Sequence, residues 1–504
     1  MLEATVKKIL QARVYEAACE TPISSAPFLS RRFNNTILIK REDLQPVYSF
    51  KIRGAYNKMA QLSDEQKAKG VIAASAGNHA QGLAMAATQM GVKATIVMPR
   101  ITPEIKVAAV RARGAKVVLK GDAFSAAAEH AKALVAEYGY TYVPPFDDVD
   151  VIAGQGTVAV EMLRQHSGRL DAIFVPVGGG GLIAGVASYV KYLRPDIKVI
   201  GVESEDSASL KAALDAGERV VLEQVGVFAE GVAVAQVGEV PFALMQHLVD
   251  DVITVTADEM CAAVKDIFED TRAVSETSGA LSLAGLKKYI QQTGAEGETL
   301  MCINSGANTN FDRLQHIAER TSLGEQREAI LAVTINEAPG SFKKFCRALG
   351  KRMVTEFSYR YADDSAAHIF VGVQVKPGGD DRQAVIAKLL EADYAVEDLT
   401  DNELAKLHIR HLSGGRPSAN VAEELYRFEF PERPGALMNF LTQLPHDWNI
   451  SLFHYRNHGA AYGRVLVGMQ VPNGDSAHIE KHLDTIGYRY WRESDNPAYQ
   501  LFMA

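Results

Sequence analysis

Several features that define other classes of protein are missing from this chain. Only four of its 504 residues are cysteines, and their wide spacing fits neither a metal site nor a disulfide framework. No apolar run is long enough to span a bilayer, and the first residues lack the apolar segment of a secretory signal. The formal net charge of −8 offers no basic excess for nucleic acid or an anionic membrane. We therefore expect a cytoplasmic protein with reduced thiols and no metal site.

The chain does contain enough apolar sequence, 47%, to bury more than one core. From about residue 70, short β-branched runs alternate with helical patterns. We expect strands over 70–74, 93–98, 116–119, 172–177, 199–202 and 299–303, and helices over 80–90, 103–113 and 122–138, the last capped by Asp122. This alternation predicts an α/β fold with a doubly wound parallel sheet that helices cover on both faces.

Four consecutive glycines, Gly178, Gly179, Gly180 and Gly181, form the most informative motif. They follow the apolar run that ends at residue 177 and precede a helical pattern that starts at Leu182. Bare backbone N–H groups at the positive end of a helix dipole bind phosphate. A tight turn alone would be a costly use of four glycines, because each loses extra backbone entropy on folding.

Three kinds of phosphate compete for this loop. A nucleoside triphosphate site requires Gly-Lys-Ser/Thr, and Leu182 and Ile183 stand there instead. A dinucleotide site requires a third glycine, which Ile183 and Ala184 replace, although Glu203 resembles its ribose-binding acid. The third possibility is a small phosphorylated cofactor that is anchored elsewhere in the chain.

Lys51 is the candidate anchor. It follows Phe50, whose ring could lie against a flat cofactor, and it opens an apolar-faced helix. A partly desolvated amine has a lowered pKa and a free lone pair for attack on an aldehyde.

Two further loops follow expected strands, where the ligands of parallel sheets bind. Ser75, Ala76 and Gly77 offer N–H groups to a substrate carboxylate, and Asn78 could donate to a cofactor oxygen or simply cap a helix. We interpret His79 as a packed residue. Ser305 could bond a ring nitrogen or be a turn serine.

The composition changes after about residue 320, where two stretches resemble each other at a fixed offset. Residues 369–375 match 465–471, 96 positions later, and a Pro-Gly pair recurs as Pro339-Gly340 and Pro434-Gly435. We interpret this as a duplicated α+β module that reads strand, Pro-Gly loop, helix, strand, strand. The expected divisions are a catalytic domain over 1–320, modules over 327–401 and 423–504, and a linker over 402–422.

The residues of these motifs resemble those of a known family. Ser-Phe-Lys-Ile-Arg-Gly-Ala, Ser-Ala-Gly-Asn-His-Ala-Gln-Gly, the glycine run and Ser-Gly-Ala-Asn look like fold type II pyridoxal-phosphate enzymes. With the duplicated, ACT-like C-terminal module, almost the whole chain is similar to the biosynthetic threonine dehydratases, or threonine ammonia-lyases. One departure is Glu276-Thr277-Ser278-Gly279, where the family commonly has Glu-Pro-Ser-Gly. The role of Glu276 stays open.

The resemblance implies a role for each site residue. Lys51 forms the covalent bond to the pyridoxal 5'-phosphate aldehyde, Phe50 contacts the ring, and Asn78 bonds the ring hydroxyl oxygen. Gly178 to Leu182 hold the phosphate, and Ser305 faces the pyridine nitrogen. The substrate carboxylate is received by Ser75, Ala76, Gly77 and Asn78.

The implied reaction is β-elimination of water from L-threonine, which gives 2-oxobutanoate and ammonia and begins isoleucine biosynthesis. The resemblance also implies a homotetramer inhibited by isoleucine, with valine as a competing activator, and effector sites near Pro339, Gly340, Pro434 and Gly435. Three alternatives stay open. The chain could be a serine dehydratase or racemase of the same fold, or an amino-acid-binding regulator with a dead catalytic domain. If the glycine run binds a dinucleotide, the chain is instead a nicotinamide-dependent enzyme.

Overall fold

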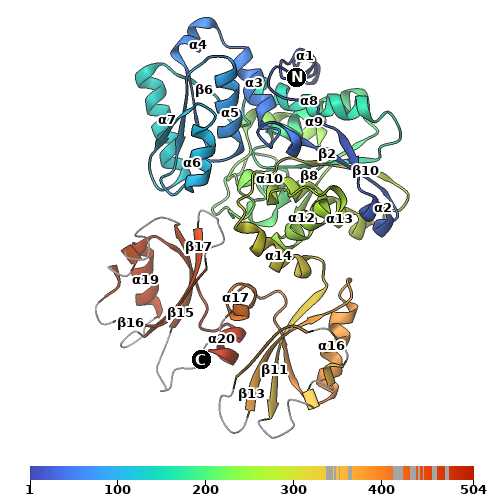
Figure 1. Ribbon diagram of the computed structural model, residues 1–504, viewed down its shortest axis with the longest axis vertical. Coiled ribbons are helices and arrows are strands. Elements are labelled where there is room, and N and C mark those ends of the chain that lie inside the picture. Colours follow the sequence, from blue (N-terminus) through green and yellow to red (C-terminus); the bar gives the residue numbers. More distant parts are fainter. Residues whose placement is uncertain are drawn as a thin grey trace. The chain divides into compact units, whose positions relative to one another are not determined.

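The structure, a computed structural model, forms two compact units, Met1–Phe311 and Asp312–Ala504 (Figure 1). It describes residues 1–336, 344–345, 348–350, 352, 354–360, 366–411, 424–431, 439–440, 443–445, 448–456, 462–470 and 476–503. The two Pro-Gly loops suggested for effector binding, Pro339-Gly340 and Pro434-Gly435, lie outside these residues. The finer domain divisions given above stay predictions.

The first unit contains two sheets, whereas the sequence suggested a single one. The larger has the order β1-β2-β10-β7-β8-β9, and only β1 is antiparallel to its neighbour. Its strands are β1 (Ile23–Ser25), β2 (Thr36–Arg41), β10 (Thr299–Asn304), β7 (Ala172–Pro176), β8 (Lys198–Ser204) and β9 (Asp251–Val255).

The smaller sheet is wholly parallel and has the order β5-β4-β3-β6. Its strands are β5 (Lys116–Leu119), β4 (Ala94–Met98), β3 (Val71–Ala74) and β6 (Thr141–Tyr142). These four strands are consecutive in the chain, so the segment from 71 to 142 pairs with itself. It forms a separate sheet that is inserted in the chain between β2 and β7, so the predicted parallel α/β fold is confirmed with its strands divided between two sheets.

Helices cover both sheets, as predicted. Figure 1 shows α8 and α9 on one side of the larger sheet and α12 and α13 on the other. The helices of this unit are α1 (Leu2–Leu10), α2 (Pro27–Phe33), α3 (Lys51–Ala60), α4 (Asp64–Lys69), α5 (Asn78–Gln89), α6 (Glu104–Arg111), α7 (Phe124–Tyr138), α8 (Val149–Gln165), α9 (Gly181–Leu193), α10 (Ser209–Ala216), α11 (Glu239–Leu248), α12 (Ala257–Thr271) and α13 (Thr277–Thr293), with short 3-10 turns η1 (Glu42–Leu44), η2 (Glu205–Ser207) and η3 (Glu230–Val232). One capping prediction is wrong: the N-cap of α7 is Ala123 rather than Asp122.

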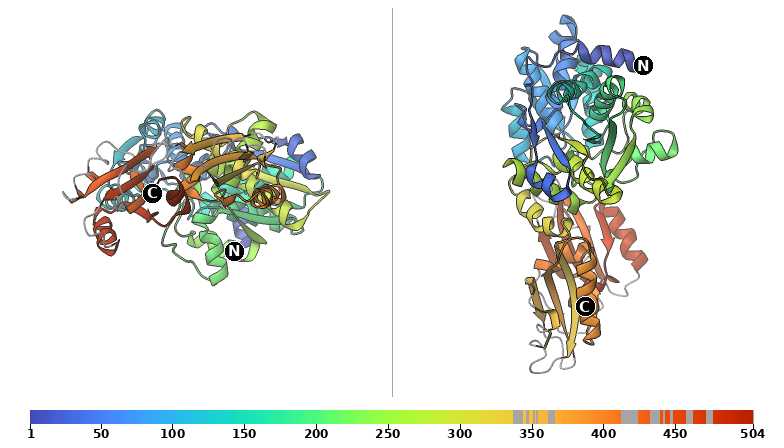
Figure 2. Two further views of the ribbon diagram at one scale, coloured as in Figure 1. Left: turned by 90° about the horizontal axis from the view of Figure 1, so that it is seen from below. Right: turned by 90° about the vertical axis from the view of Figure 1, so that its right-hand side faces the viewer.

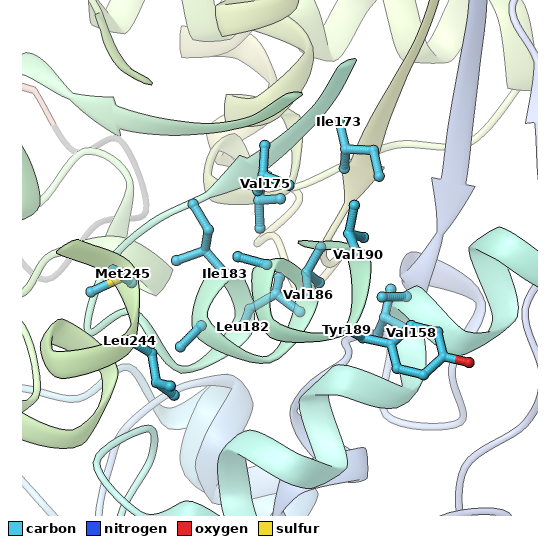
Figure 3. Close-up of a cluster of buried hydrophobic side chains, with 14 of the residues drawn as sticks. Val158, Ile173, Val175, Leu182, Ile183, Val186, Tyr189, Val190, Leu244 and Met245 are labelled. Carbon is cyan, nitrogen blue, oxygen red and sulfur yellow. The ribbon is translucent and has the colours of Figure 1, made fainter. Parts of the chain in front are cut away.

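An apolar cluster around α9 fixes the position of the glycine run (Figure 3). Leu182 and Ile183 of α9 pack in the same core as Val175 of β7 and Met245 of α11. Every residue of β7 is buried, which explains why this strand reads as an unbroken apolar run. Because the first turn of α9 is held in this core, the loop that leads into it is held as well.

The second unit contains two four-stranded antiparallel sheets of the same topology, β12-β13-β11-β14 and β16-β17-β15-β18. The strands are β11 (Glu328–Asn336), β12 (Val354–Arg360), β13 (Ala366–Gln374), β14 (Ala395–Asp398), β15 (Glu424–Pro431), β16 (Asn449–Arg456), β17 (Tyr462–Gln470) and β18 (Arg489–Arg492). The register of β12 shifts between Val354 and Glu356, and that of β16 shifts between Ile450 and Leu452. The duplicated α+β module is therefore confirmed.

Among the described residues, each module contains a helix and a strand that the sequence did not predict: α16 (Asp380–Glu391) with β14, and α19 (Ser476–Ile486) with β18. The described part of this unit also contains α14 (Arg313–Gly324), α17 (Glu403–Leu407) and α20 (Pro497–Phe502), with the turn η4 (Ile409–His411). α17 and η4 fall inside the segment that the sequence suggested as a linker.

Both faces of the module sheets are buried. In β11, alternate residues Leu331 and Val333 pack under α16, whereas Ile330 lies on the other face, in a cluster with Leu425 of the second module. Figure 2 shows the two module sheets from further directions. The two modules thus share one core. Over the residues described, no helix is both long enough and apolar enough to cross a membrane.

Candidate active site

The motifs from distant parts of the first unit meet around one cavity. The glycine run follows β7, and Ser305 follows β10, so both lie at carboxyl ends of parallel strands. The cavity is lined by Phe50, Lys51, Asn78, Phe146, Pro176, Gly178, Gly179, Gly180, Gly181, Leu182, Gly231, Val232, Glu276, Ser278 and Ser305.

Lys51 is the first residue of α3, as predicted, and is half-buried in the cavity wall. Its Nζ donates to the Pro145 carbonyl oxygen at 2.8 Å and lies 5.2 Å from the centroid of the Phe50 ring. Withdrawal of the amine from water lowers its pKa from 10.5 to about 8, and Glu276 partly opposes this shift. A much larger share of this amine is neutral near pH 7 than of an ordinary lysine.

The glycine run has no room for side chains. A Cβ at Gly180 would lie 2.6 Å from Met245 Cε, one at Gly178 would lie 2.8 Å from Val232 Cα, and one at Gly179 would overlap the Phe146 ring. Gly180 also has a φ of +90°, which L residues rarely adopt. The first N–H groups of α9 have no partner within the helix, so this bare backbone presents donors for an anion.

Asn78, the first residue of α5, is held on both sides. Its Nδ2 donates to Glu276 Oε1 at 2.6 Å, and its Oδ1 accepts from Asn308 Nδ2 at 2.7 Å. Asn308 also donates to the Val47 carbonyl oxygen at 2.8 Å. These bonds join the smaller sheet, which α5 follows, to the loops after β10 and before α13.

Ser305 is buried, and its Oγ donates to the Ser278 carbonyl oxygen at 3.3 Å. Its main-chain carbonyl oxygen accepts from the Phe50 N–H at 3.2 Å, which connects this loop to the residue before Lys51. A neutral hydroxyl in the cavity wall can donate to or accept from a ring nitrogen without adding charge.

Ser75, Ala76 and Gly77 precede α5 but do not line the cavity themselves. The Ser75 hydroxyl accepts from the N–H groups of Gly77 at 3.4 Å and Ala80 at 3.3 Å, so it organises the start of α5. A Cβ at Gly77 would meet nothing within 4 Å, so space is open beside this backbone. Its role in carboxylate binding stays a prediction.

His79 is buried, as predicted, and its Nε2 lies 2.8 Å from the Val143 carbonyl oxygen. Burial lowers its pKa to about 3, with a further contribution from the Lys51 charge. The imidazole is therefore neutral and donates through Nε2, which leaves it a packing role.

Comparisons with known proteins agree with this geometry. A family model described as pyridoxal-phosphate dependent enzyme matches residues 14–306. The model of the C-terminal regulatory domain of threonine dehydratase matches twice, over residues 319–409 and 414–503. The chain is 55% identical to the L-threonine dehydratase biosynthetic IlvA of Burkholderia multivorans, with 99% of each chain covered. The chain belongs to the biosynthetic threonine dehydratase family.

Two further relatives support this assignment. The L-threonine dehydratase biosynthetic IlvA of Escherichia coli is 56% identical, over 99% of this chain and 97% of that protein. Among solved structures, the processed form of threonine deaminase isoform 2 from Solanum lycopersicum has a TM-score of 0.62 at 48% identity. That alignment covers 63% of this chain and 93% of the tomato chain. The dehydratase is therefore a pyridoxal-phosphate dependent enzyme with a regulatory domain.

The dinucleotide reading of the glycine run is wrong. Glu203, its candidate ribose-binding acid, is buried after β8 and accepts from the N–H groups of Leu210 at 2.7 Å and Lys211 at 2.8 Å. It stabilises the start of α10 and is not part of the cavity lining.

Sequence reasoning missed several lining residues. Phe146 follows the two-residue strand β6, and Val232 belongs to the short turn η3, so neither stands in a recognisable motif. Glu276 and Ser278 belong to a recognisable motif, Glu276-Thr277-Ser278-Gly279, which departs from the Glu-Pro-Ser-Gly of the family. That motif was the sequence signal for these two lining residues.

Proposed function

We propose that this chain deaminates L-threonine to 2-oxobutanoate and ammonia by β-elimination of water, as the first step of isoleucine biosynthesis. The observation that carries the proposal is the convergence of Lys51, Ser305 and the glycine run on one cavity. Full-length similarity to biosynthetic threonine dehydratases supports the substrate.

The residues present fit pyridoxal 5'-phosphate. Gly178 to Leu182 would hold the phosphate, because their backbone leaves no space for side chains and their N–H groups open α9. Ser305 would face the ring nitrogen, Phe50 the ring, and Asn78 the ring hydroxyl oxygen. Lys51 would bind the aldehyde, since a half-buried amine with a pKa of about 8 is a competent nucleophile.

When bound, the cofactor supplies an electron sink for charge that develops at the substrate Cα. Lys51 would take the Cα proton, the β-hydroxyl would leave with a proton as water, and the place of Lys51 at the start of α3 would keep the base beside Cα. The N–H groups near Gly77 and Asn78 would orient the substrate carboxylate. Ser305 adds no charge at the ring nitrogen, which favours rapid loss of the β-hydroxyl over side reactions.

The decisive experiment combines an assay with covalent trapping. Oxo-acid formation is measured from L-threonine and L-serine, and the protein is reduced with borohydride and its peptides are analysed by mass spectrometry. We expect turnover of threonine and a pyridoxyl adduct on Lys51. Lys58 lies on the same helix, paired with Asp148 at 2.7 Å, and serves as the internal control that stays unmodified.

Each alternative has its own outcome in this experiment. Turnover of serine alone, or formation of D-serine, would indicate a serine dehydratase or racemase. Absence of both adduct and turnover would indicate a regulator with a dead catalytic domain, and would overturn the proposal.

The regulatory part of the proposal is that isoleucine inhibits the enzyme and valine competes as an activator, in a cytoplasmic homotetramer. The paired C-terminal modules support control by small amino acids. The proposed effector positions Pro339, Gly340, Pro434 and Gly435 are tested by alanine substitution and isothermal titration with isoleucine, and unchanged affinity in all variants would exclude them.

A further inference from the structure

Glu276 occupies a central place in the cavity wall that the proposed roles leave unexplained. It is the N-cap residue of α13, and its main-chain N–H donates to the Gly306 carbonyl oxygen at 3.1 Å. Its Oε1 lies 2.6 Å from the position that a Cβ on Gly306 would take. The carboxyl group is therefore packed directly against the loop that carries Ser305, and only glycine at position 306 leaves room for it.

The carboxyl group determines how the Asn78 amide is oriented. A carboxylate accepts hydrogen bonds, so the amide must turn its NH₂ towards Glu276 and its oxygen towards the NH₂ of Asn308. An amide NH₂ has two hydrogens, and Glu276 requires only one of them. The other can serve an oxygen in the cavity, which is the role expected of Asn78.

Glu276 lines the same cavity as Lys51, and its negative charge opposes the lowering of the pKa of Lys51 by burial. The other charged groups around this pair are Lys106 of α6 and Glu230 of η3, which form an ion pair with each other. His79 of α5 also faces Lys51 and is neutral. Because the Lys106–Glu230 pair compensates its own charge, the charge of Glu276 is what favours the protonated form of Lys51.

We propose that Glu276 is a positioning residue of this enzyme, which orients the Asn78 amide and controls the protonation of Lys51. The inference rests on the proposed function for its consequence in catalysis. Its two parts are separable, because one depends on an acceptor oxygen and the other on a charge.

Two substitutions separate the parts. Glu276→Gln keeps an acceptor oxygen for Asn78 and removes the charge. Glu276→Leu removes both the acceptor oxygen and the charge, so its difference from Glu276→Gln isolates the orienting role. Glu203→Gln is the matched control, because Glu203 is a buried glutamate that accepts hydrogen bonds at a helix start and lies outside the cavity.

The first measurement follows the reactivity of Lys51 in the full-length, cofactor-free chain. The protein is pulsed with an amine-acylating reagent between acidic and alkaline pH, and acylation of Lys51 is quantified by peptide mass spectrometry. The second measurement is the dissociation constant of pyridoxal 5'-phosphate, from fluorescence titration. Circular dichroism and the melting temperature establish that each variant is folded.

For Glu276→Gln we expect the apparent pKa of Lys51 to fall by about one unit, so that its acylation below that pKa becomes about tenfold faster. Its cofactor affinity should change by less than about threefold, since the bond to Asn78 is retained. For Glu276→Leu we expect the Lys51 profile of Glu276→Gln and a cofactor dissociation constant about tenfold higher than in Glu276→Gln. Glu203→Gln should match the wild type in both.

A Lys51 profile in Glu276→Gln that coincides with those of the wild type and Glu203→Gln would overturn the charge role. Cofactor affinity in Glu276→Leu equal to that of Glu276→Gln would overturn the orienting role. If Glu276→Gln does not fold, Glu276→Asp keeps the charge, and a large shift of the Lys51 profile in that variant would also contradict the proposal. Wild-type turnover of threonine is measured separately, so failure of the proposed function remains distinguishable.

Discussion

The amine of Lys51 lies 2.8 Å from the carbonyl oxygen of Pro145, a residue of the loop between β6 and α8. This bond ties the proposed nucleophile to an element almost a hundred positions further along the chain. The helix that Lys51 begins, α3, is also joined to α8, which follows that loop, because the Gly54 N–H donates to Gln155 Oε1 at 3.2 Å. The direction of the Lys51 side chain is thus determined by how α3 packs on α8.

The capture of cofactor by the cofactor-free chain should depend steeply on pH. Only the neutral amine attacks an aldehyde, and with a pKa of about 8 the neutral fraction of Lys51 grows as pH rises towards 8. We expect the second-order rate to rise about tenfold per pH unit below that value and to level off above it. Stopped-flow absorbance measures this rate, and an inflection at the ordinary lysine value would contradict the prediction.

Gly180→Ala should weaken cofactor binding by at least about tenfold and destabilise the first unit by about 1–3 kcal/mol. The new Cβ would be strained at a φ of +90° and would also meet Met245. Gly217→Ala is the matched control: it has a φ of +73°, and nothing lies within 4 Å of its Cβ position. It should cost similar stability and leave cofactor affinity unchanged, as titration and thermal unfolding will show.

Arg53 is the centre of a charge network that has no access to solvent. Its guanidinium donates to Glu42 at 2.8 Å and to Glu161 at 2.6 Å, and Glu161 also accepts from Lys40 at 2.6 Å. Arg53→Met would leave the buried Glu42 without its arginine and Glu161 with Lys40 as its remaining buried cation, so we expect a loss of about 3–5 kcal/mol in the free energy of unfolding.

The control for this substitution is Arg13→Met, which removes an exposed arginine paired with Glu16 at 2.7 Å. An exposed pair contributes at most about 1 kcal/mol. Urea unfolding followed by fluorescence gives both values, and equal losses for the two variants would contradict a special role for the buried network.

Removal of residues 312–504 should leave an active enzyme that isoleucine does not inhibit. The first unit has its own cores, and the solved tomato threonine deaminase chain covers 63% of this chain. Turnover of threonine is measured with and without isoleucine for both forms. Full inhibition of the shortened enzyme would place the effector site in the first unit.

The parts of the site that could be predicted are those whose chemistry is carried by neighbouring residues. The glycine run was recognisable because four glycines, a buried strand and a helix are adjacent in sequence, and Lys51 because Phe50 and a helix start flank it. The strand and helix positions followed from apolar periodicity in the same way.

The other parts depend on pairing between distant segments. Phe146 reaches the cavity only because β6 pairs with β3, and a two-residue strand leaves no periodic pattern. The network of Arg53 joins Glu42 and Glu161, which are more than a hundred positions apart, so each reads as an ordinary charged residue. The split into two sheets was missed for the same reason, since strand order is a long-range property.

The cluster that contains Ile330, Phe370, Leu425 and Leu466 has a consequence for how such a protein can be shortened. Cutting the chain between the two modules would expose the apolar face of the module that remained. An exposed apolar β-sheet face promotes aggregation. The two modules should therefore be retained or removed together, and we do not expect a stable enzyme that keeps one module alone.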